Sequence, residues 1–102
     1  MTNREIEQLE TADTSYLVEL REALERLEQN EDFQKVILNG YLSEKPLGLV
    51  SMLARHDVKQ RGERPNVMEE LIAVSTLGQY FFMIKQLGGS AKVDLEEEEV
   101  MQ

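Results

Sequence analysis

The stretch NVMEELIAVSTLGQYFFMIKQL, Asn66 to Leu87, decides the fold of this chain. Asn66 is a favourable N-cap residue, and Glu69 three residues later completes a reciprocal cap, so a helix is predicted to begin here. The dipeptide Gly88-Gly89 is typical of a helix end, because glycine accepts the left-handed backbone that closes one. The spacing predicts a helix of about 22 residues, roughly 33 Å long, which is the longest element of the chain.

Apolar side chains of this helix point in nearly every direction. They form rows at helical spacing, which are Val67, Leu71, Val74, Gly78 and Phe81; Ala73, Leu77, Tyr80, Ile84 and Leu87; and the start of a third, Met68, Ile72 and Phe82. Such a helix must be covered on most sides, and soluble monomers rarely expose so long a patch. We therefore expect a homo-oligomer whose interface consists of Leu71, Val74, Leu77, Gly78, Tyr80, Phe81, Phe82 and Ile84.

Gly78 lies in the middle of this helix, where glycine costs about 1 kcal/mol relative to alanine. Because it has no side chain, another backbone can come close to it. Gly78 is thus an expected point of contact between two copies of the chain. The alternative is that it packs within one chain.

Shorter helices are predicted before the long one. Four leucines from Leu17 to Leu27 recur every three or four residues and so share one face of a helix from about Ser15 to Gln29. A second short helix is predicted to begin near Asn30. It is expected to stop at the pair Asn39-Gly40, where glycine can close the helix end.

A third short helix is predicted to begin at Ser43. Serine is a favourable capping residue, and Pro46 falls in the first turn, where it breaks no internal hydrogen bond. The helix is expected to end near His56. The polar sequence DVKQRGERP, residues 57–65, follows and is predicted to be a loop.

The chain as a whole is predicted to be all-α, a small bundle of about four helices with a long C-terminal helix. No run of residues alternates between apolar and polar as a strand does. Residues 14–89 are expected to form the helical domain, and residues 1–13 an N-terminal arm or short helix. Residues 90–102 are expected to form an acidic flexible tail, with Asp94 and the run Glu96 to Glu99.

Length and composition limit the number of domains and disfavour membrane, secreted and nucleic-acid-binding proteins. The 102 residues suffice for one domain with a small core, and the absence of cysteine excludes disulfides and thiolate metal sites. No run approaches the roughly 20 apolar residues of a membrane span, and the charged N-terminus is unlike a secretory signal. The net charge of -9 disfavours binding to nucleic acid. A cytoplasmic protein that contacts no membrane is expected.

Basic residues nevertheless gather in one place. From Lys45 to Arg64 there are five bases and two acids, a local net charge of +3. No aromatic residue is interleaved with them, as nucleic-acid sites often require for base stacking. This basic loop is either a solvated connector between helices or a binding site. As a binding site, we expect it to bind an acidic protein surface, including that of a neighbouring copy, in preference to nucleic acid. The predicted partner-binding residues are Arg55, Lys59, Arg61 and Arg64.

Catalytic and cofactor chemistry finds little support in the sequence. The one histidine, His56, lies beside Asp57, but no nucleophile motif accompanies them. A single histidine among scattered carboxylates does not give a metal-ligand spacing. The glycine pairs follow helices instead of preceding them, so they do not predict a phosphate cradle. We expect no enzyme activity, no cofactor and no metal, and His56 is expected to be an exposed residue at a helix end.

Two stretches carry a resemblance to a known group. FQKVILNGYLSEKPLGLVSMLA, followed after a polar loop by LIAVSTLGQYFFMIKQLGGSA and an acidic end, resembles small acidic helical proteins of tailed bacteriophages. That group has a short helix ending in a glycine-aromatic pair, here Gly40-Tyr41, and a long helix with an aromatic-rich centre, here Tyr80, Phe81 and Phe82. The resemblance covers roughly residues 20–100 and implies a phage origin and a place among packaging and virion-assembly genes. It implies no catalytic residues.

These observations together predict a protein that acts through protein surfaces. We expect an accessory factor in virion assembly or packaging, located in the host-cell cytoplasm or associated with the virion, with a viral or host protein as its partner. The first alternative is an inhibitor of a host enzyme whose acidic helix faces imitate nucleic acid, and the second is an enzyme that uses His56 and Asp57. In one predicted helix Glu19, Glu22, Glu25 and Glu28 advance by three residues, so they drift around the helix and do not follow one line of phosphates.

Overall fold

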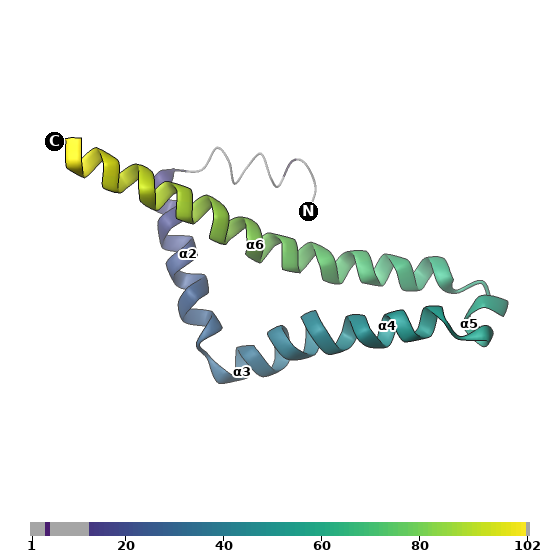
Figure 1. Cartoon of the computed structure of the whole chain (residues 1–102). Coiled ribbons are helices and arrows are strands. Elements are labelled where there is room, and N and C mark those ends of the chain that lie inside the picture. Colours follow the sequence, from purple (N-terminus) through teal and green to yellow (C-terminus); the bar gives the residue numbers. More distant parts are fainter. Residues whose placement is uncertain (1–3, 5–12, 102) are drawn as a thin grey trace. The chain divides into compact units, whose positions relative to one another are not determined.

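The computed structural model of the chain describes Arg4 and residues 13–101. The N-terminal arm predicted for residues 1–13 therefore falls almost wholly outside the described residues. The elements are α2 (Thr14–Glu28), α3 (Glu31–Phe33), η1 (Gln34–Glu44, a π-helix), α4 (Lys45–Leu53), α5 (His56–Gln60) and α6 (Arg64–Met101) (Figure 1). There is no strand in the part of the chain that the structure describes, which confirms the all-α prediction.

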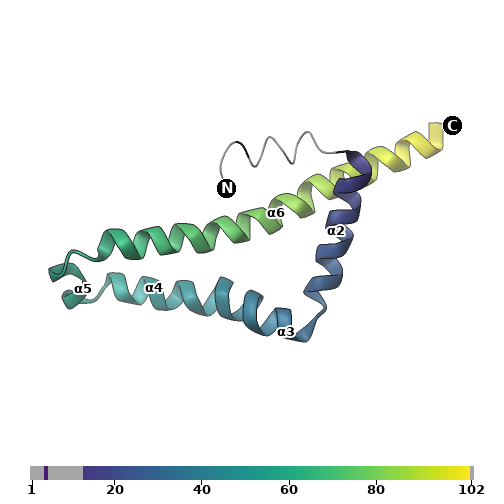
Figure 2. The same ribbon diagram turned by 180° about the vertical axis from the view of Figure 1, so that it is seen from behind.

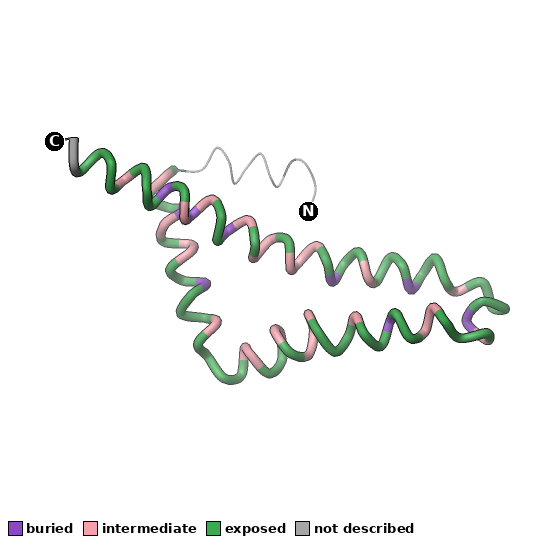
Figure 3. Tube along the Cα trace, viewed as in Figure 1, coloured by how far each residue is buried: buried purple, intermediate pink, exposed green. Residues whose placement is uncertain are grey.

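The chain divides into two compact units. The terminal unit is Met1–Gln29 with Gln79–Gln102, and the hairpin unit is Asn30–Gly78. The boundary falls within α6, so this helix contributes its first part to the hairpin unit and its remainder to the terminal unit. Each unit has buried apolar residues of its own (Figure 3).

In the terminal unit, α2 begins one residue before the predicted start. The carboxylate of Asp13 accepts a hydrogen bond from the backbone N–H of Ser15 at 2.7 Å and so caps the helix. Leu17 and Leu24 of the predicted leucine row are buried, and Leu27 is exposed. From α6, Ile84 and Ala91 are buried as well. The Lys85 ammonium pairs with the Glu28 carboxylate at 2.7 Å and joins α6 to α2.

The helices α2 and α6 approach each other closely at Gly88. A Cβ atom placed on Gly88 would overlap the Cβ of Arg21 and would lie 2.8 Å from the carbonyl oxygen of Leu17. Only a residue without a side chain therefore fits at this crossing. Gly78, the predicted point of close approach, is different, because a Cβ there would meet only the Leu42 side chain at an ordinary 3.9 Å.

The predicted end of the last helix at Gly88-Gly89 is wrong. α6 begins at Arg64, two residues before the predicted cap Asn66, and continues to Met101. The segment expected to be a flexible tail is thus helical as far as Met101, with the run Glu96 to Glu99 exposed on it. Gly88 has helical backbone, and the side of Gly88 where a side chain would stand faces α2. No left-handed turn is needed there.

In the hairpin unit, α3, η1 and α4 follow one another without a turn. The helix begins at Glu31, near the predicted start, and Asn30 caps it, because its side chain accepts a hydrogen bond from the N–H of Phe33 at 3.0 Å. The predicted stop at Gly40 and the predicted cap at Ser43 are both wrong. Gly40 lies inside η1, and the Ser43 hydroxyl donates to the carbonyl of Leu38, five residues back, at 2.9 Å.

Pro46 gives a physical reason for the π-helix. In a regular α-helix its ring would clash with the carbonyl four residues earlier. The wider π turn, in which the Lys45 N–H donates to the carbonyl of Gly40, ends directly before Pro46 and relieves that clash. The chain can therefore continue from η1 into α4, with proline in the first turn of α4.

α4 and the first part of α6 lie side by side and antiparallel (Figures 1 and 2). Their direction follows from two contacts, since Arg64 reaches the carbonyl of Leu53 while Gly78 lies beside Leu42. The core between them, completed by α5, consists of Leu49, Val58, Val67 and Val74, with Tyr41, Leu42, Met52, Leu53 and Leu71 packed against it.

The segment predicted as a loop, residues 57–65, contains most of the short helix α5. Its Val58 is the one described residue whose side chain is fully buried, at 0% exposure. A buried valine between two polar residues gives too short a pattern to predict a helix. Gly62 follows with φ 69°, the left-handed backbone that turns the chain into α6.

Candidate functional site

The predicted basic loop forms the corner between α4 and α6, and we name residues 55–64 the basic corner. Arg55 lies in extended backbone directly before α5, and His56 is the first residue of that helix. His56 is exposed, as predicted, but it lies at the beginning of a helix and not at the end of one. The corner closes over the buried side chain of Val58.

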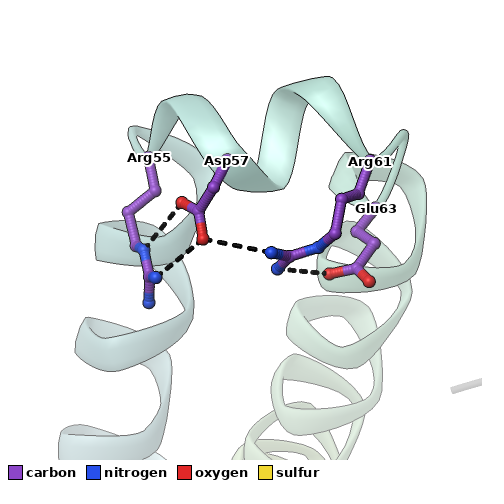
Figure 4. A network of polar contacts seen from close by, with 4 residues as sticks. All are labelled: Arg55, Asp57, Arg61 and Glu63. Carbon is purple, nitrogen blue, oxygen red and sulfur yellow. Dashed lines mark hydrogen bonds and ion pairs between the residues drawn. The ribbon is translucent and has the colours of Figure 1, made fainter.

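Four charged side chains of the basic corner form a network on its surface (Figure 4). Arg55 donates to both carboxylate oxygens of Asp57, from Nε at 3.0 Å and from Nη2 at 2.8 Å. Arg61 bridges the two acids, donating to Asp57 at 3.2 Å and to Glu63 at 3.1 Å. The network ties the beginning of α5 to its end and to the residue before α6.

The network leaves part of the positive charge exposed. The side chains of Arg55 and Arg61 are 60% and 54% exposed. Their charges are opposed at close range by Asp57 and Glu63, so an acidic partner would meet two bridged arginines and not four free bases. Among the described residues, the side chain of Lys59 has no ion-pair partner.

The network perturbs two of its members. Hydrogen bonding from Arg55 is the main cause that lowers the pKa of Asp57. Desolvation is the next largest effect and opposes it, and the charges of Arg55 and Arg61 lower the pKa further. Hydrogen bonding to Glu63 raises the pKa of Arg61, which stays charged in any case. The Asp57 carboxylate is thus held ionised by its neighbours.

We expect Asp57 to titrate below the ordinary aspartate value of about 3.9. Because the folded-state pKa is lowered, the ionised carboxylate stabilises the fold at pH values above the unfolded value. That contribution is lost as the pH falls through the folded value. Carboxyl-carbon NMR titration measures this directly, and Arg55→Gln should move the midpoint back toward the ordinary value. An unshifted midpoint in the native chain would contradict the network.

Arg64, the fourth predicted binding residue, supports the fold. Its Nε donates to the carbonyl of Leu53 at 3.1 Å, and this carbonyl belongs to the last turn of α4, where no backbone partner is available. We expect Arg64→Met to lower the free energy of unfolding by roughly 0.5–1 kcal/mol in urea titration. The matched variant Lys59→Met should leave it unchanged. Equal losses in both would show that charge, and not the Leu53 contact, matters.

The predicted oligomer interface is largely covered within the chain. Val74 and Ile84 are buried, and Leu71, Leu77, Gly78, Tyr80 and Phe81 are partly buried. Phe82 is the exception, at 58% exposure. Val74 belongs to the hairpin core, so that row of α6 faces α4 and is not free for a second copy. Covered on that side, α6 turns a different row outward.

The hairpin unit exposes an apolar face, of which only the row of Met68 and Ile72 is evident from the sequence. We name it the apolar face, and its residues are Leu47, Val50, Met68 and Ile72, of which Leu47 is 70% exposed. Val50 directly follows the core residue Leu49, and Met68 directly follows the core residue Val67.

Helix geometry puts these residues on one side of the hairpin. Consider two antiparallel helices that face each other, viewed from one end of the pair. Successive residues turn clockwise in one helix and counter-clockwise in the other, because the chains run in opposite directions. The residue that follows a contact residue therefore points to the same side of the pair in both helices. Val50 and Met68 therefore share a side. Leu47 lies three residues before Val50, and Ile72 four residues after Met68, so each extends the same row.

By length and composition alone, one described helix, Arg64–Glu99 within α6, would suffice to cross a membrane. The core helix of a soluble protein meets the same criterion. In α6 the longest run without a charged residue extends from Leu71 to Ile84, 14 residues between Glu70 and Lys85. That run is shorter than the roughly 20 residues a span requires.

The described residues contain no group of three or more histidine, aspartate or glutamate side chains that could hold a metal ion. Comparisons of the chain with family models, with curated proteins and with solved structures found no match.

Proposed function

We propose that the chain is a non-enzymatic protein that works by binding another protein, as an accessory factor in the assembly or packaging of phage particles. The observation that carries the proposal is the set of large apolar side chains that its helices expose. Scattered single residues of this kind are normal on soluble proteins, but several on neighbouring turns mark a surface that another protein covers. The exposed residues are Tyr16, Leu27, Val36, Leu47, Val50, Met68, Ile72, Phe82 and Val93.

Phe82 is the best anchor for a heterologous partner in the terminal unit. Aromatic residues contribute strongly to protein interfaces, because they bury a large area and lose little conformational entropy. Phe82 lies on α6 two residues before the buried Ile84, so the helix backbone that carries it is held by the packing of this unit. A rigid helix with an exposed aromatic side chain offers a preformed contact.

The test places a photo-reactive amino acid at Phe82 in cells that assemble the phage particle, with Asp94, an exposed polar position on the same helix, as the control. Mass spectrometry then identifies the cross-linked protein. The proposal expects a structural or packaging protein of the particle from position 82 and at most a weak product from position 94. Absence of any product at position 82, or identical products at both positions, would contradict it.

The alternative, inhibition of a host enzyme by an acidic surface, has less support in the structure. Within the row Glu19, Glu22, Glu25 and Glu28 of α2, Glu25 pairs with Arg21 at 3.3 Å and Glu28 pairs with Lys85 at 2.7 Å. Two of the four carboxylates are therefore partly neutralised. A host nucleic-acid enzyme as the cross-linked product would favour this alternative over assembly.

A further inference from the structure

The four residues of the apolar face are arranged symmetrically. The Arg64 side chain reaches the carbonyl of Leu53, and Leu42 lies beside Gly78, so the two antiparallel helices are aligned to within about one turn. Between these two contacts, Val50 lies near the level of Met68, and Leu47 lies near the level of Ile72. The midpoint between Leu47 and Val50 therefore lies near the level of the midpoint between Met68 and Ile72. A single twofold axis can pass through both.

Such an axis, running across α4 and α6 in the plane of the face, makes the face complementary to itself. It sets Leu47 of one copy against Val50 of the other, and Met68 against Ile72. Every large apolar side chain of the face thus meets another one. The result is an antiparallel four-helix arrangement, in which knobs of one pair fit between those of the second.

Charge permits a second copy at this face and selects the direction of the axis. The hairpin unit has seven acidic and six basic residues, so it is nearly neutral although the chain carries -9. Two hairpin units therefore repel each other little. Each basic corner has four bases and two acids. A twofold axis parallel to the helices would bring the two basic corners together at one end of the dimer. The axis across the helices puts them at opposite ends, so that like charges stay apart.

The size of the face suits a reversible dimer. Each copy offers two helices about 10 Å apart over roughly 17 Å of length. Mutual burial then removes on the order of 1,000 Å² for the pair, at the lower end of the sizes of specific interfaces. Small exposed residues on the same rows, Ser43, Ala54 and Ser75, leave room for the second pair of helices.

We propose that the apolar face is the docking site of a second copy of this chain, related by a twofold axis across α4 and α6. The inference rests on the proposed function, because both state that the chain acts through protein surfaces. It adds that one partner of the hairpin unit is a second copy of the chain. The interface differs from the one predicted from sequence, because it uses the row of α6 next to the buried row and an equal contribution from α4.

Light scattering over a series of protein concentrations tests the dimer. The native chain should pass from a monomer of 11.8 kDa toward twice that mass as the concentration rises. Ile72→Asp should weaken dimerisation at least about 30-fold, because a carboxylate would be buried at the centre of the interface. The matched control Ala73→Asp makes the same change one residue away, on the opposite side of the hairpin, and should dimerise like the native chain.

Circular dichroism accompanies each variant, and Leu47→Ser repeats the test from α4 should Ile72→Asp lose helicity. A native chain that stays monomeric overturns the inference, as do equal effects of Asp at positions 72 and 73. These outcomes are separable from failure of the proposed function. A monomer that still cross-links to a particle protein through position 82 overturns the dimer alone, whereas a dimer without that product overturns the assembly role alone.

Discussion

Val58→Asp is expected to unfold the hairpin unit. Val58 is the described side chain with no exposed surface, and it closes the core formed with Leu49, Val67 and Val74. A carboxylate at this position would be buried without a partner, at a cost of roughly 3–5 kcal/mol, which is a large share of the stability of a small unit. Hydrogen exchange should show loss of protection in α4 and α5.

Two variants make this result specific. Val36→Asp introduces the same carboxylate at an exposed valine and should leave protection unchanged. Val58→Ala removes only two methyl groups and should cost roughly 1–3 kcal/mol through the cavity it leaves. If Val58→Asp retained full protection, the short helix α5 would not close the core as described.

Gly88→Ala is expected to separate α2 from α6. The new Cβ would overlap the Cβ of Arg21 and approach the carbonyl oxygen of Leu17 to 2.8 Å, so the two backbones must move apart. Overpacking of this kind costs roughly 1–3 kcal/mol, which outweighs the gain of about 1 kcal/mol in helix propensity. Amide exchange in α2 should therefore accelerate, while α6 remains helical.

The neighbouring glycine provides a matched control of opposite sign. A Cβ on Gly89 would meet only the end of the Arg21 side chain, at 3.9 Å. Gly89→Ala should consequently stabilise the terminal unit by up to about 1 kcal/mol, since only the helix propensity changes. Equal effects of the two substitutions would mean that α2 does not cross α6 at Gly88.

Apolar spacing predicts α2 and the long helix α6 but not the short helix α5, and glycine is a poor guide to where the helices end. The leucine row from Leu17, the cap at Asn30 and the long helix all follow from local patterns that tertiary packing reinforces. Gly40 and Gly88 were expected to be helix ends because glycine allows left-handed backbone. Glycine allows this conformation without requiring it, and among the described glycines only Gly62 adopts it. Gly88 instead fits against Leu17 and Arg21 of α2, which lie far away in the sequence, so no local pattern predicts its role.

The candidate site shows the same limit. The charges of the basic corner are evident from sequence, but their pairing depends on the fold of α5, which brings Arg61 to both Asp57 and Glu63. The apolar face could not be predicted, because exposure of Ile72 depends on which side of α6 meets α4. The regular spacing of Ser43, Leu47, Val50 and Ala54 was the one signal that could have indicated an outer row on α4.

Because the chain contains no cysteine, disulfide cross-linking gives the most direct test of the apolar face as an interface between two copies. Ser43 and Ala54 lie on the same row as Leu47 and Val50, at its two ends. In the twofold arrangement Ser43 of one copy lies level with Ala54 of the other. Two copies of either residue alone are about 16 Å apart along the helices, beyond the roughly 7 Å that a disulfide allows.

The measurement mixes Ser43→Cys and Ala54→Cys chains under mild oxidation and resolves the products by mass spectrometry. We predict that the mixed disulfide between the two variants dominates and that Ile72→Asp in both chains abolishes it. Preferential pairing of each variant with itself, or mixed disulfide that persists undiminished with Ile72→Asp, would contradict the antiparallel interface and with it the central role of the apolar face.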